Sequence, residues 1–384
     1  MTPAARHAAA IEVLDRVLAG AAAEKALTTW ARGSRFAGSG DRAAVRDLVF
    51  DALRCRASHA ALGGGLTGRG LILGGLKDRG QDPSQVFTGD RHAPPQLTSD
   101  EIAGGRTPDR LEALDCPAWL APDLEASLGP DFAPVMTALR RRAPVQLRVN
   151  LRKATRAAAA DRLAVEGIAT VPNPLSPAAL DVTAGARAVQ GCAAYAQGWV
   201  ELQDAASQAA ADTLPVAAGA RVLDYCAGGG GKTLALAGRA EAQFFAHDAA
   251  PRRMVDLPAR AARAGVSVRL LDAPAAAAPY DLALCDVPCS GSGAWRRSPE
   301  AKWRLDRAGL DRLIALQAAI LDAAAPLVAP GGVLAYATCS VIEAENGAQV
   351  AAFLARSRGW RQAGAWRWRP GEGGDGFFIA HLTR

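Results

Sequence analysis

The sequence predicts an α/β protein of three parts: an all-helical N-terminal domain, a small α/β domain and a larger α/β domain. Apolar stripes at helical spacing fill residues 4–62. An alternating strand pattern begins at residue 145, and beyond residue 196 short apolar runs alternate with helical patterns. Such interleaving is typical of a parallel sheet covered on both faces. We expect the domains to span residues 1–143, 144–195 and 196–384.

The N-terminal domain is predicted to be helical because its apolar residues recur at helical and not at strand spacing. The apolar stripe at residues 45–53 is preceded by Asp41, which we expect to cap that helix. Residues 63–108 are rich in glycine, proline and polar residues and predict a long loop, interrupted by a short helix at 71–77. Helical patterns return in two further segments, at residues 117–128 and 132–142.

The middle domain is expected to begin with a strand at residues 145–150, followed by a helix at 155–166 and a second strand at 168–171. Thr155 is the predicted cap of that helix. Basic residues without an acidic residue between them lie at the entrance of this domain: Arg140, Arg141, Arg142, Arg148, Arg152 and Lys153. They form either a ridge that contacts RNA phosphates or a solvated helix end.

Composition limits the classes of function. The net charge is +6 and the pI is near 9.1, values compatible with a polyanionic partner. The sequence has neither a signal-peptide pattern nor the roughly 18 apolar residues of a membrane span, so we expect a cytoplasmic protein without membrane contact. Its seven cysteines include no CxxC pair and its five histidines are scattered, so neither a disulfide framework nor a metal site is expected.

The C-terminal domain is predicted to contain a sheet whose strands alternate with helices. We expect strands at residues 221–225, 244–247, 266–271, 282–285 and 333–337, and helices at 233–239, 252–264 and 310–327. Ligands of such sheets bind beyond the carboxyl ends of the strands. The residues that follow each strand are therefore the candidates for function.

A glycine-rich loop follows the first of these strands and reads DYCAGGGGKT, from Asp224 to Thr233. A nucleotide-binding P-loop requires glycine where Cys226 stands, and the dinucleotide pattern requires glycine where Thr233 stands. The remaining interpretations are an S-adenosylmethionine loop and a purely structural turn. Two carboxylates favour the first, because Asp248 and Asp272 end the next two strands. There they can bind the ribose hydroxyls and the adenine amino group, although either could instead cap a helix.

Two cysteines end the last two strands, in the segments Asp286-Val-Pro-Cys289 and Thr338-Cys339-Ser340. C5 of cytosine is a poor nucleophile, and a thiolate that adds to C6 makes C5 able to accept a methyl group. Such a thiolate needs a lowered pKa, which Lys232 and a bound sulfonium would favour. Asp286 is placed to contact N3 and the amino group of the base. We expect four of the other cysteines to be buried in the core as small apolar side chains: Cys55, Cys116, Cys192 and Cys285.

These motifs resemble those of the Nop/Sun-type RNA cytosine-5 methyltransferases. The resemblance rests on DYCAGGGGKT, DVPCSGSG and ATCS, with GWVELQDAASQAAA and DGFFIAHLTR beside them. The segment DRAAVRDLVFDALR resembles the NusB-like RNA-binding domain of the bacterial ribosomal RNA small-subunit methyltransferase B group, and QLRVNLRKATR resembles its small linking domain. The resemblance implies a Rossmann-like methyltransferase domain that is preceded by an all-α NusB-like domain and a small α/β linking domain.

The resemblance also implies roles for single residues. Cys339 would attack C6, and Cys289 would assist release of the RNA, although the residues alone leave open which cysteine attacks. The implied S-adenosylmethionine pocket comprises Cys226, Ala227, Gly228, Gly229, Gly230, Gly231, Lys232, Asp248, Arg253, Asp272 and Asp286. The implied contacts to RNA phosphates are Arg296, Arg297 and Lys302, for which a solvated face is the alternative.

The implied activity is cytosine-5 methylation of 16S ribosomal RNA by a monomeric enzyme. The alternatives are a tRNA cytosine-5 methyltransferase, a catalytically idle RNA-binding assembly factor, and an enzyme acting on DNA or a small molecule. One departure from the family is noteworthy, because Gly228 and Gly229 replace the usual alanine and proline. We expect this loop to be more flexible without cofactor, since proline fixes φ.

Overall fold

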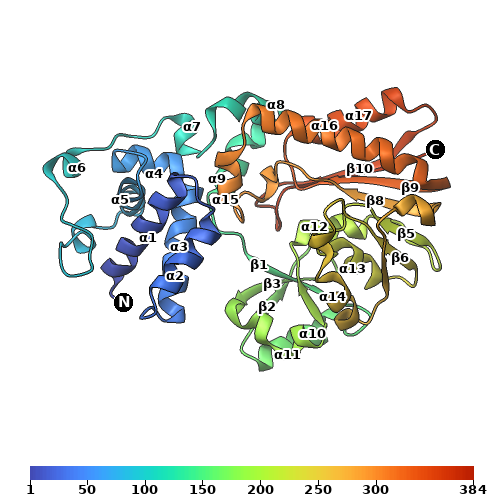
Figure 1. Ribbon diagram of the computed structural model, residues 1–384, viewed down its shortest axis with the longest axis horizontal. Helices are drawn as coiled ribbons and strands as arrows, with labels where there is room; N and C mark the ends of the chain where they lie inside the picture. The colour runs from blue at the N-terminus through green and yellow to red at the C-terminus, as the bar shows by residue number, and fades with distance from the viewer. The chain divides into compact units, whose positions relative to one another are not determined.

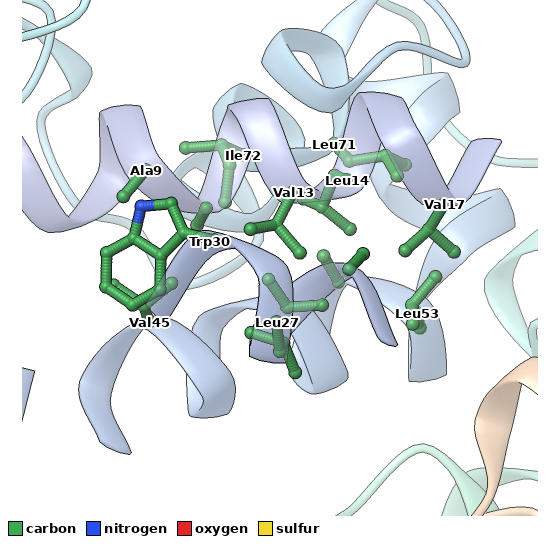
Figure 2. Close-up of a cluster of buried hydrophobic side chains, with 14 of the residues drawn as sticks. Ala9, Val13, Leu14, Val17, Leu27, Trp30, Val45, Leu53, Leu71 and Ile72 are labelled. Atoms are coloured by element: carbon green, nitrogen blue, oxygen red, sulfur yellow. The ribbon is translucent and has the colours of Figure 1, made fainter. Parts of the chain in front are cut away.

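The N-terminal helices share one apolar core. In the computed structural model, which describes residues 1–384, they are α1 (Pro3–Leu18), α2 (Ala23–Gly33), α3 (Ser39–Arg54), α4 (Arg56–Gly63) and α5 (Gly68–Asp78). Figure 2 shows how side chains from these helices meet, with Trp30 of α2 beside Val45 of α3, and Val13 and Leu14 of α1 beside Leu71 of α5. The predicted helical domain is thus held together by apolar burial between helices far apart in sequence.

The start of α3 differs from the prediction. Its N-cap is Gly38, and Asp41 is the third helical residue. The Asp41 carboxylate accepts hydrogen bonds from the Gly38 amide at 3.3 Å and from Arg6 Nε at 2.9 Å, and it pairs with the amino group of Met1 at 3.1 Å. Asp41 is therefore held by two positive groups of α1 and the chain start, in addition to its place in the first helical turn.

The remaining elements before the first sheet are short. They are η1 (Pro83–Gln85), α6 (Ser99–Ala103), α7 (Arg110–Ala113), η2 (Ala118–Leu120), α8 (Ala121–Leu128), η3 (Gly129–Asp131) and α9 (Phe132–Leu139). A distant segment also packs with the helical unit, because α15 (Pro299–Arg304) contacts α3. There Lys302 Nζ donates to the carbonyl of Arg54 at 3.1 Å, and Trp303 Nε1 donates to that of Leu53 at 2.7 Å.

A four-stranded antiparallel sheet follows, in the order β2-β3-β1-β4. Its strands are β1 (Val145–Val149), β2 (Ala169–Pro172), β3 (Ala179–Ala184) and β4 (Val200–Leu202), with helices α10 (Arg156–Val165), η4 (Ala186–Gly191) and α11 (Ala193–Ala196). The Thr155 hydroxyl caps α10 by accepting from the amide of Ala158, as predicted. The predicted βαβ piece is split, because β3 lies between β1 and β2.

The large sheet has the order β10-β11-β9-β8-β5-β6-β7. Five adjacent strands are parallel, as predicted: β5 (Arg221–Asp224), β6 (Gln243–Ala246), β7 (Val268–Leu270), β8 (Tyr280–Asp286) and β9 (Val328–Thr338). The antiparallel pair β10 (Arg361–Trp368) and β11 (Phe377–Thr383), which was not predicted, extends it. The chain runs outward from β5 in one direction to β7 and in the other through β8 to β9, so the strand order reverses beside β5.

Helices cover both faces of this sheet, as Figure 1 shows. One face packs against α12 (Ala205–Asp212) and α13 (Gly231–Ala237), with α14 (Leu257–Ala264) beside them, and the other against α16 (Arg307–Ala324) and α17 (Gly347–Arg356). Short 3₁₀ turns complete the unit: η5 (Pro251–Met254), η6 (Pro274–Ala277), η7 (Ser292–Ala294), η8 (Ala325–Leu327) and η9 (Glu343–Glu345). The buried sheet leaves its carboxyl edge as the place for a site.

By compactness the chain divides into two units, where we expected three domains. One unit comprises Met1–Glu125, Gly129–Arg142 and Trp295–Leu305, and the other comprises Ala126–Leu128, Ala143–Ala294 and Asp306–Arg384. The small sheet belongs to the second unit because α12 packs on β1 and β3 as well as on β11. None of the helices is both long and apolar enough to span a membrane.

Candidate active site

Two thiols meet at the carboxyl edge of the large sheet. Cys289 lies just beyond β8 and Cys339 just beyond β9, and because these strands are parallel neighbours, their ends coincide. The two Sγ atoms lie 3.4 Å apart, and both side chains are half-buried. The amide of Gly293 also donates to the carbonyl of Cys339 at 2.9 Å, which ties the two loops together. The structure thus brings together the two cysteines that the sequence singled out.

The environment gives the two thiols different properties. The hydrogen bond with Cys339, burial, and the nearby charges of Cys339 and Glu345 raise the pKa of the Cys289 thiol well above its ordinary value. Cys289 therefore retains its proton at neutral pH and can donate it in a hydrogen bond to the Cys339 sulfur. A protonated Cys289 therefore places a hydrogen-bond donor 3.4 Å from the sulfur of Cys339.

Lys232 and Asp286 form a short ion pair at the same edge. Lys232 Nζ donates to Asp286 Oδ2 at 2.6 Å, and the lysine is buried whereas Asp286 is half-exposed. The ammonium also lies 4.4 Å from the centre of the Phe377 ring, which adds a cation–π contact. Lys232 is therefore fixed between a carboxylate and an aromatic face. Phe377 was not predicted as a site residue, since it reaches this position on β11, from the far end of the chain.

The glycine-rich loop connects β5 to α13. Gly228 and Gly230 have φ values of 51° and 76°, which side chains rarely adopt. A Cβ at Gly230 would lie 2.2 Å from Cδ1 of Leu257, a buried side chain of α14. Both the backbone conformation and the contact with α14 thus require glycine at position 230.

Side chains from other elements hold this loop. Asp248 Oδ2 accepts from the amide of Gly228 at 2.9 Å, Arg260 Nη1 donates to the carbonyl of Gly229, and Arg148 Nη1 donates to that of Gly231 at 2.6 Å. Neither arginine was predicted to take part, and no sequence pattern connects them to the loop. Arg260 thereby restrains Gly229, the position at which the Nop/Sun-type sequences usually have proline. Flexibility of this loop without cofactor stays a prediction.

The acids at the ends of β6 and β7 have different surroundings. Asp248 is buried, and it accepts from Ala250 N at 2.9 Å and pairs with the exposed side chain of Arg253 at 3.1 Å. Asp272 is exposed beyond β7. A loop without side chains, next to a fixed carboxylate and near an exposed one, fits a ligand that carries a ribose diol and an amino-bearing base.

Two further groups of the loop are Asp224, which is buried, and Cys226, which is half-buried. Asp224 accepts from Thr233 Oγ1 at 2.7 Å, and burial raises its pKa to about 6. Burial and the charges of Asp224 and Asp286 raise the pKa of the Cys226 thiol well above its ordinary value, which makes Cys226 a poor nucleophile. The cysteines that we expected in the core are all buried: Cys55, Cys116, Cys192 and Cys285.

The prediction of a phosphate-binding ridge is wrong for Arg148, which is buried, whereas phosphate contact by the exposed members of the cluster stays a prediction. Arg148 is buried against the glycine loop, and Arg152 and Lys153 donate to backbone carbonyls of the large α/β unit. Arg140 and Arg142 pair with Asp115 and Asp47 of the helical unit, respectively. The prediction for Lys302 is also wrong, since its side chain is 1% exposed. Arg296 is likewise buried, whereas Arg297 is exposed.

Comparison with known proteins places these features in context. Residues 211–383 match the sequence model of the 16S rRNA methyltransferase RsmB/F family, and residues 116–189 match the ferredoxin-like domain of the same proteins. The second match includes α8 and α9, which we had assigned to the N-terminal domain. Ribosomal RNA small subunit methyltransferase B of Xylella fastidiosa strain Temecula1 is 38% identical, over 70% of this chain and 67% of that protein.

Solved structures share the fold. PH0851 superposes with a TM-score of 0.80 at 23% identity, over 100% of this chain and 99% of its own. A methyltransferase homologue from Pyrococcus horikoshii gives a TM-score of 0.64 at 23% identity, over 72% of this chain and 98% of its own. At these identities the structures bear on the fold alone.

Proposed function

Since the chain belongs to the RsmB/F family of 16S rRNA methyltransferases, we propose that it uses S-adenosylmethionine to methylate C5 of a cytosine in small-subunit ribosomal RNA. The observation that carries this proposal is the 3.4 Å separation between the Sγ atoms of Cys289 and Cys339 at the rim of the sheet. Methylation of a nitrogen or a hydroxyl group needs no thiol, whereas activation of a pyrimidine C5 requires a nucleophile at C6.

Cys339 is the proposed nucleophile. Its thiolate forms a bond from Sγ to C6, and the electron pair of the C5–C6 bond moves toward the N3 side of the ring, which makes C5 nucleophilic. Bound S-adenosylmethionine supplies an electrophilic methyl group. After C5 has lost its proton to a base, the S–C6 bond breaks, its electron pair returns to Sγ, and the C5–C6 double bond re-forms.

Cys289 is proposed to act on the sulfur of Cys339. Because its pKa is raised, Cys289 keeps the proton and donates a hydrogen bond to Cys339 Sγ. Negative charge is present on that sulfur before attack and again after the S–C6 bond breaks. A donor at this point therefore favours release of the RNA, which agrees with the role that the family resemblance implies.

Asp286 and Lys232 are proposed to hold the base. Asp286 Oδ2 is engaged by Lys232, so Oδ1 is oriented to accept from the cytosine amino group, as acidic side chains do with this base. The ammonium beside the carboxylate stabilises negative charge that develops on the ring. The target base must leave its stack to reach the rim, which disfavours binding by a few kcal/mol and is least unfavourable in a single-stranded loop.

The cofactor is proposed to lie against the glycine loop. Backbone atoms of residues 226–231 would approach it, Asp248 would accept from the ribose hydroxyls, and Asp272 would accept from the adenine amino group. Asp248 already has donors in Gly228, Ala250 and Arg253. Arg253 is the exposed one of the three, so its side chain is the one that would yield to the ribose.

Methyl transfer to unmodified RNA tests the proposal. The full chain is incubated with a 16S rRNA transcript and methyl-labelled S-adenosylmethionine, and the digested nucleosides are separated. Label in 5-methylcytidine is expected, and none in a reaction with the Cys339→Ala variant. Label in another nucleoside would overturn the cytosine-5 assignment. Parallel reactions with a tRNA transcript and with DNA decide the substrate, because preferential labelling of either would contradict ribosomal RNA as the target.

A further inference from the structure

A buried carboxylate bonds to the loops that carry the two thiols. Glu345, at the end of η9, has no exposed surface, and its carboxylate accepts four hydrogen bonds. Oε1 accepts from the amide of Ser290 at 2.8 Å and from Gln317 Nε2 at 3.0 Å. Oε2 accepts from Ser340 Oγ at 2.6 Å and from Ser290 Oγ. All four donors are neutral, so the negative charge is stabilised by hydrogen bonds alone.

These donors connect the carboxylate to both cysteine loops. Ser290 follows Cys289 and Ser340 follows Cys339, so one side chain bonds the neighbours of both thiols. The Ser340 hydroxyl also lies 2.9 Å from the Ser292 hydroxyl. The Glu345 carboxylate thus bridges two loops that belong to different strands.

The position of Glu345 is itself fixed by the core. Its carbonyl accepts from the hydroxyl of Tyr336, a buried residue of β9, at 2.6 Å. Gln317 of α16 donates through Nε2 both to Glu345 Oε1 and to the carbonyl of Pro288, each at 3.0 Å. A buried charge without its hydrogen bonds is strongly unfavourable, so the serine donors are held in place while the carboxylate is present.

We propose that Glu345 is a positioning residue of the reaction centre, which sets the spacing between the thiols of Cys289 and Cys339. The catalytic consequence of this spacing rests on the proposed function, in which both thiols serve one reaction. Glu345 also contributes charge. Its charge is one of four causes that raise the pKa of Cys289. The larger three are the hydrogen bond with Cys339, burial and the charge of Cys339. A neutral residue at this position would remove that contribution and leave the other three.

The spacing can be measured without RNA or cofactor by capture of phenylarsine oxide. Its trivalent arsenic bonds to two neighbouring sulfurs and releases one water as both thiols lose their protons. The full chain is titrated under reducing conditions, and capture is followed by intact mass. Signal that persists in the Cys289→Ala variant comes from other cysteines and is subtracted. The variants to compare are Glu345→Ala, which removes the bridge, and Glu345→Gln, which removes the charge but keeps one carbonyl acceptor.

Glu343 offers a matched control. It lies in the same 3₁₀ turn, but its side chain is 44% exposed and pairs with Arg367. We expect Glu343→Ala to capture the arsenical at the wild-type rate. We expect Glu345→Ala to capture it at least about tenfold more slowly, the effect of losing one hydrogen bond to a charged group that maintains the geometry. Glu345→Gln should fall between them, because its Oε1 can still accept from Ser290 N and Gln317.

A pH profile separates positioning from a merely structural role. We expect alkylation of Cys289 by iodoacetamide to rise at lower pH in Glu345→Gln than in the wild type, because the nearby negative charge is gone. Wild-type capture in folded Glu345→Ala would overturn the proposal. If that variant does not fold, an unchanged alkylation profile and wild-type capture in Glu345→Gln would overturn it. Failure of the wild type to methylate cytosine would refute the proposed function, whereas the arsenical result would still decide the role of Glu345.

Discussion

Replacement of Gly230 by alanine tests whether the loop conformation is required. The residue has a φ of 76°, and a Cβ there would lie 2.2 Å from Cδ1 of Leu257, which has no exposed surface. A left-handed conformation is unfavourable for alanine by about 1–2 kcal/mol. Displacement of a packed side chain adds about 1–3 kcal/mol. The reduced entropy of the unfolded chain returns about 0.4–1 kcal/mol.

The expected net effect of Gly230→Ala is therefore about 1–5 kcal/mol, with about 1.4 kcal/mol for each factor of ten in an equilibrium constant. If the loop keeps its conformation, the free energy of unfolding falls. If the loop relaxes, the affinity for S-adenosylmethionine falls instead, because binding must restore the conformation. The prediction concerns the sum of the two changes.

Urea unfolding and calorimetric titration with S-adenosylmethionine measure the two quantities. Gly231→Ala is the matched control, since Gly231 has no positive φ, begins α13, and would place its Cβ 3.9 Å from the nearest atom, Gln203 Nε2. Because Gly231 lies in the proposed cofactor pocket, this control serves the unfolding measurement, in which it should gain up to about 1 kcal/mol of stability from helix propensity. The reasoning fails if Gly230→Ala leaves both quantities within about 0.5 kcal/mol of the wild type, or if the control loses as much.

Three further outcomes are expected. Arg260→Ala removes the donor to the Gly229 carbonyl and should weaken S-adenosylmethionine binding by about 0.5–1.5 kcal/mol in a calorimetric titration. Unchanged affinity would show that the arginine does not restrain the loop. The pKa of Asp224 is about 6 in the folded state against 3.8 in the unfolded state, so the folded state keeps this proton to a higher pH. The free energy of unfolding of the wild type should therefore fall by about 2–3 kcal/mol as pH rises from 4 to 6. Urea unfolding of Asp224→Asn should lack this decline, and a decline that persists in the variant would show that another group causes it. Cys289→Ala should accumulate covalent enzyme–RNA complex on denaturing gels, because it lacks the donor to the Cys339 sulfur when the S–C6 bond breaks. Faster release of RNA than in the wild type would contradict that role.

The parallel sheet and the pair of thiols could be predicted from sequence because each strand is a short apolar run that ends in polar residues. Adjacent parallel strands end at one edge, so Asp286, Cys289 and Cys339 had to approach one another once β8 and β9 were neighbours. The hairpin β10–β11 was missed because β10 is largely exposed and mixes arginine, glycine and tryptophan without apolar alternation.

Groups that restrain the site from other elements could not be predicted. Arg260 and Glu345 act through tertiary contacts, and neither occupies a strand end or a recognisable spacing. The basic cluster near residue 148 shows the converse error for Arg148, because residues that are neighbours along the chain need not all be exposed. Arg148 lies on a buried strand and binds a carbonyl of the glycine loop, whereas Arg142 belongs to the helical unit.

The site of covalent attachment tests the central claim most directly. An rRNA fragment with 5-fluorocytosine at the target position cannot lose a proton from C5, so the S–C6 bond persists after methyl transfer. Digestion of the trapped complex and mass spectrometry of the RNA-linked peptide should identify Cys339, with no complex formed by Cys339→Ala. Attachment through Cys289, or methylated cytosine from the Cys339→Ala variant without any adduct, would contradict the proposed chemistry.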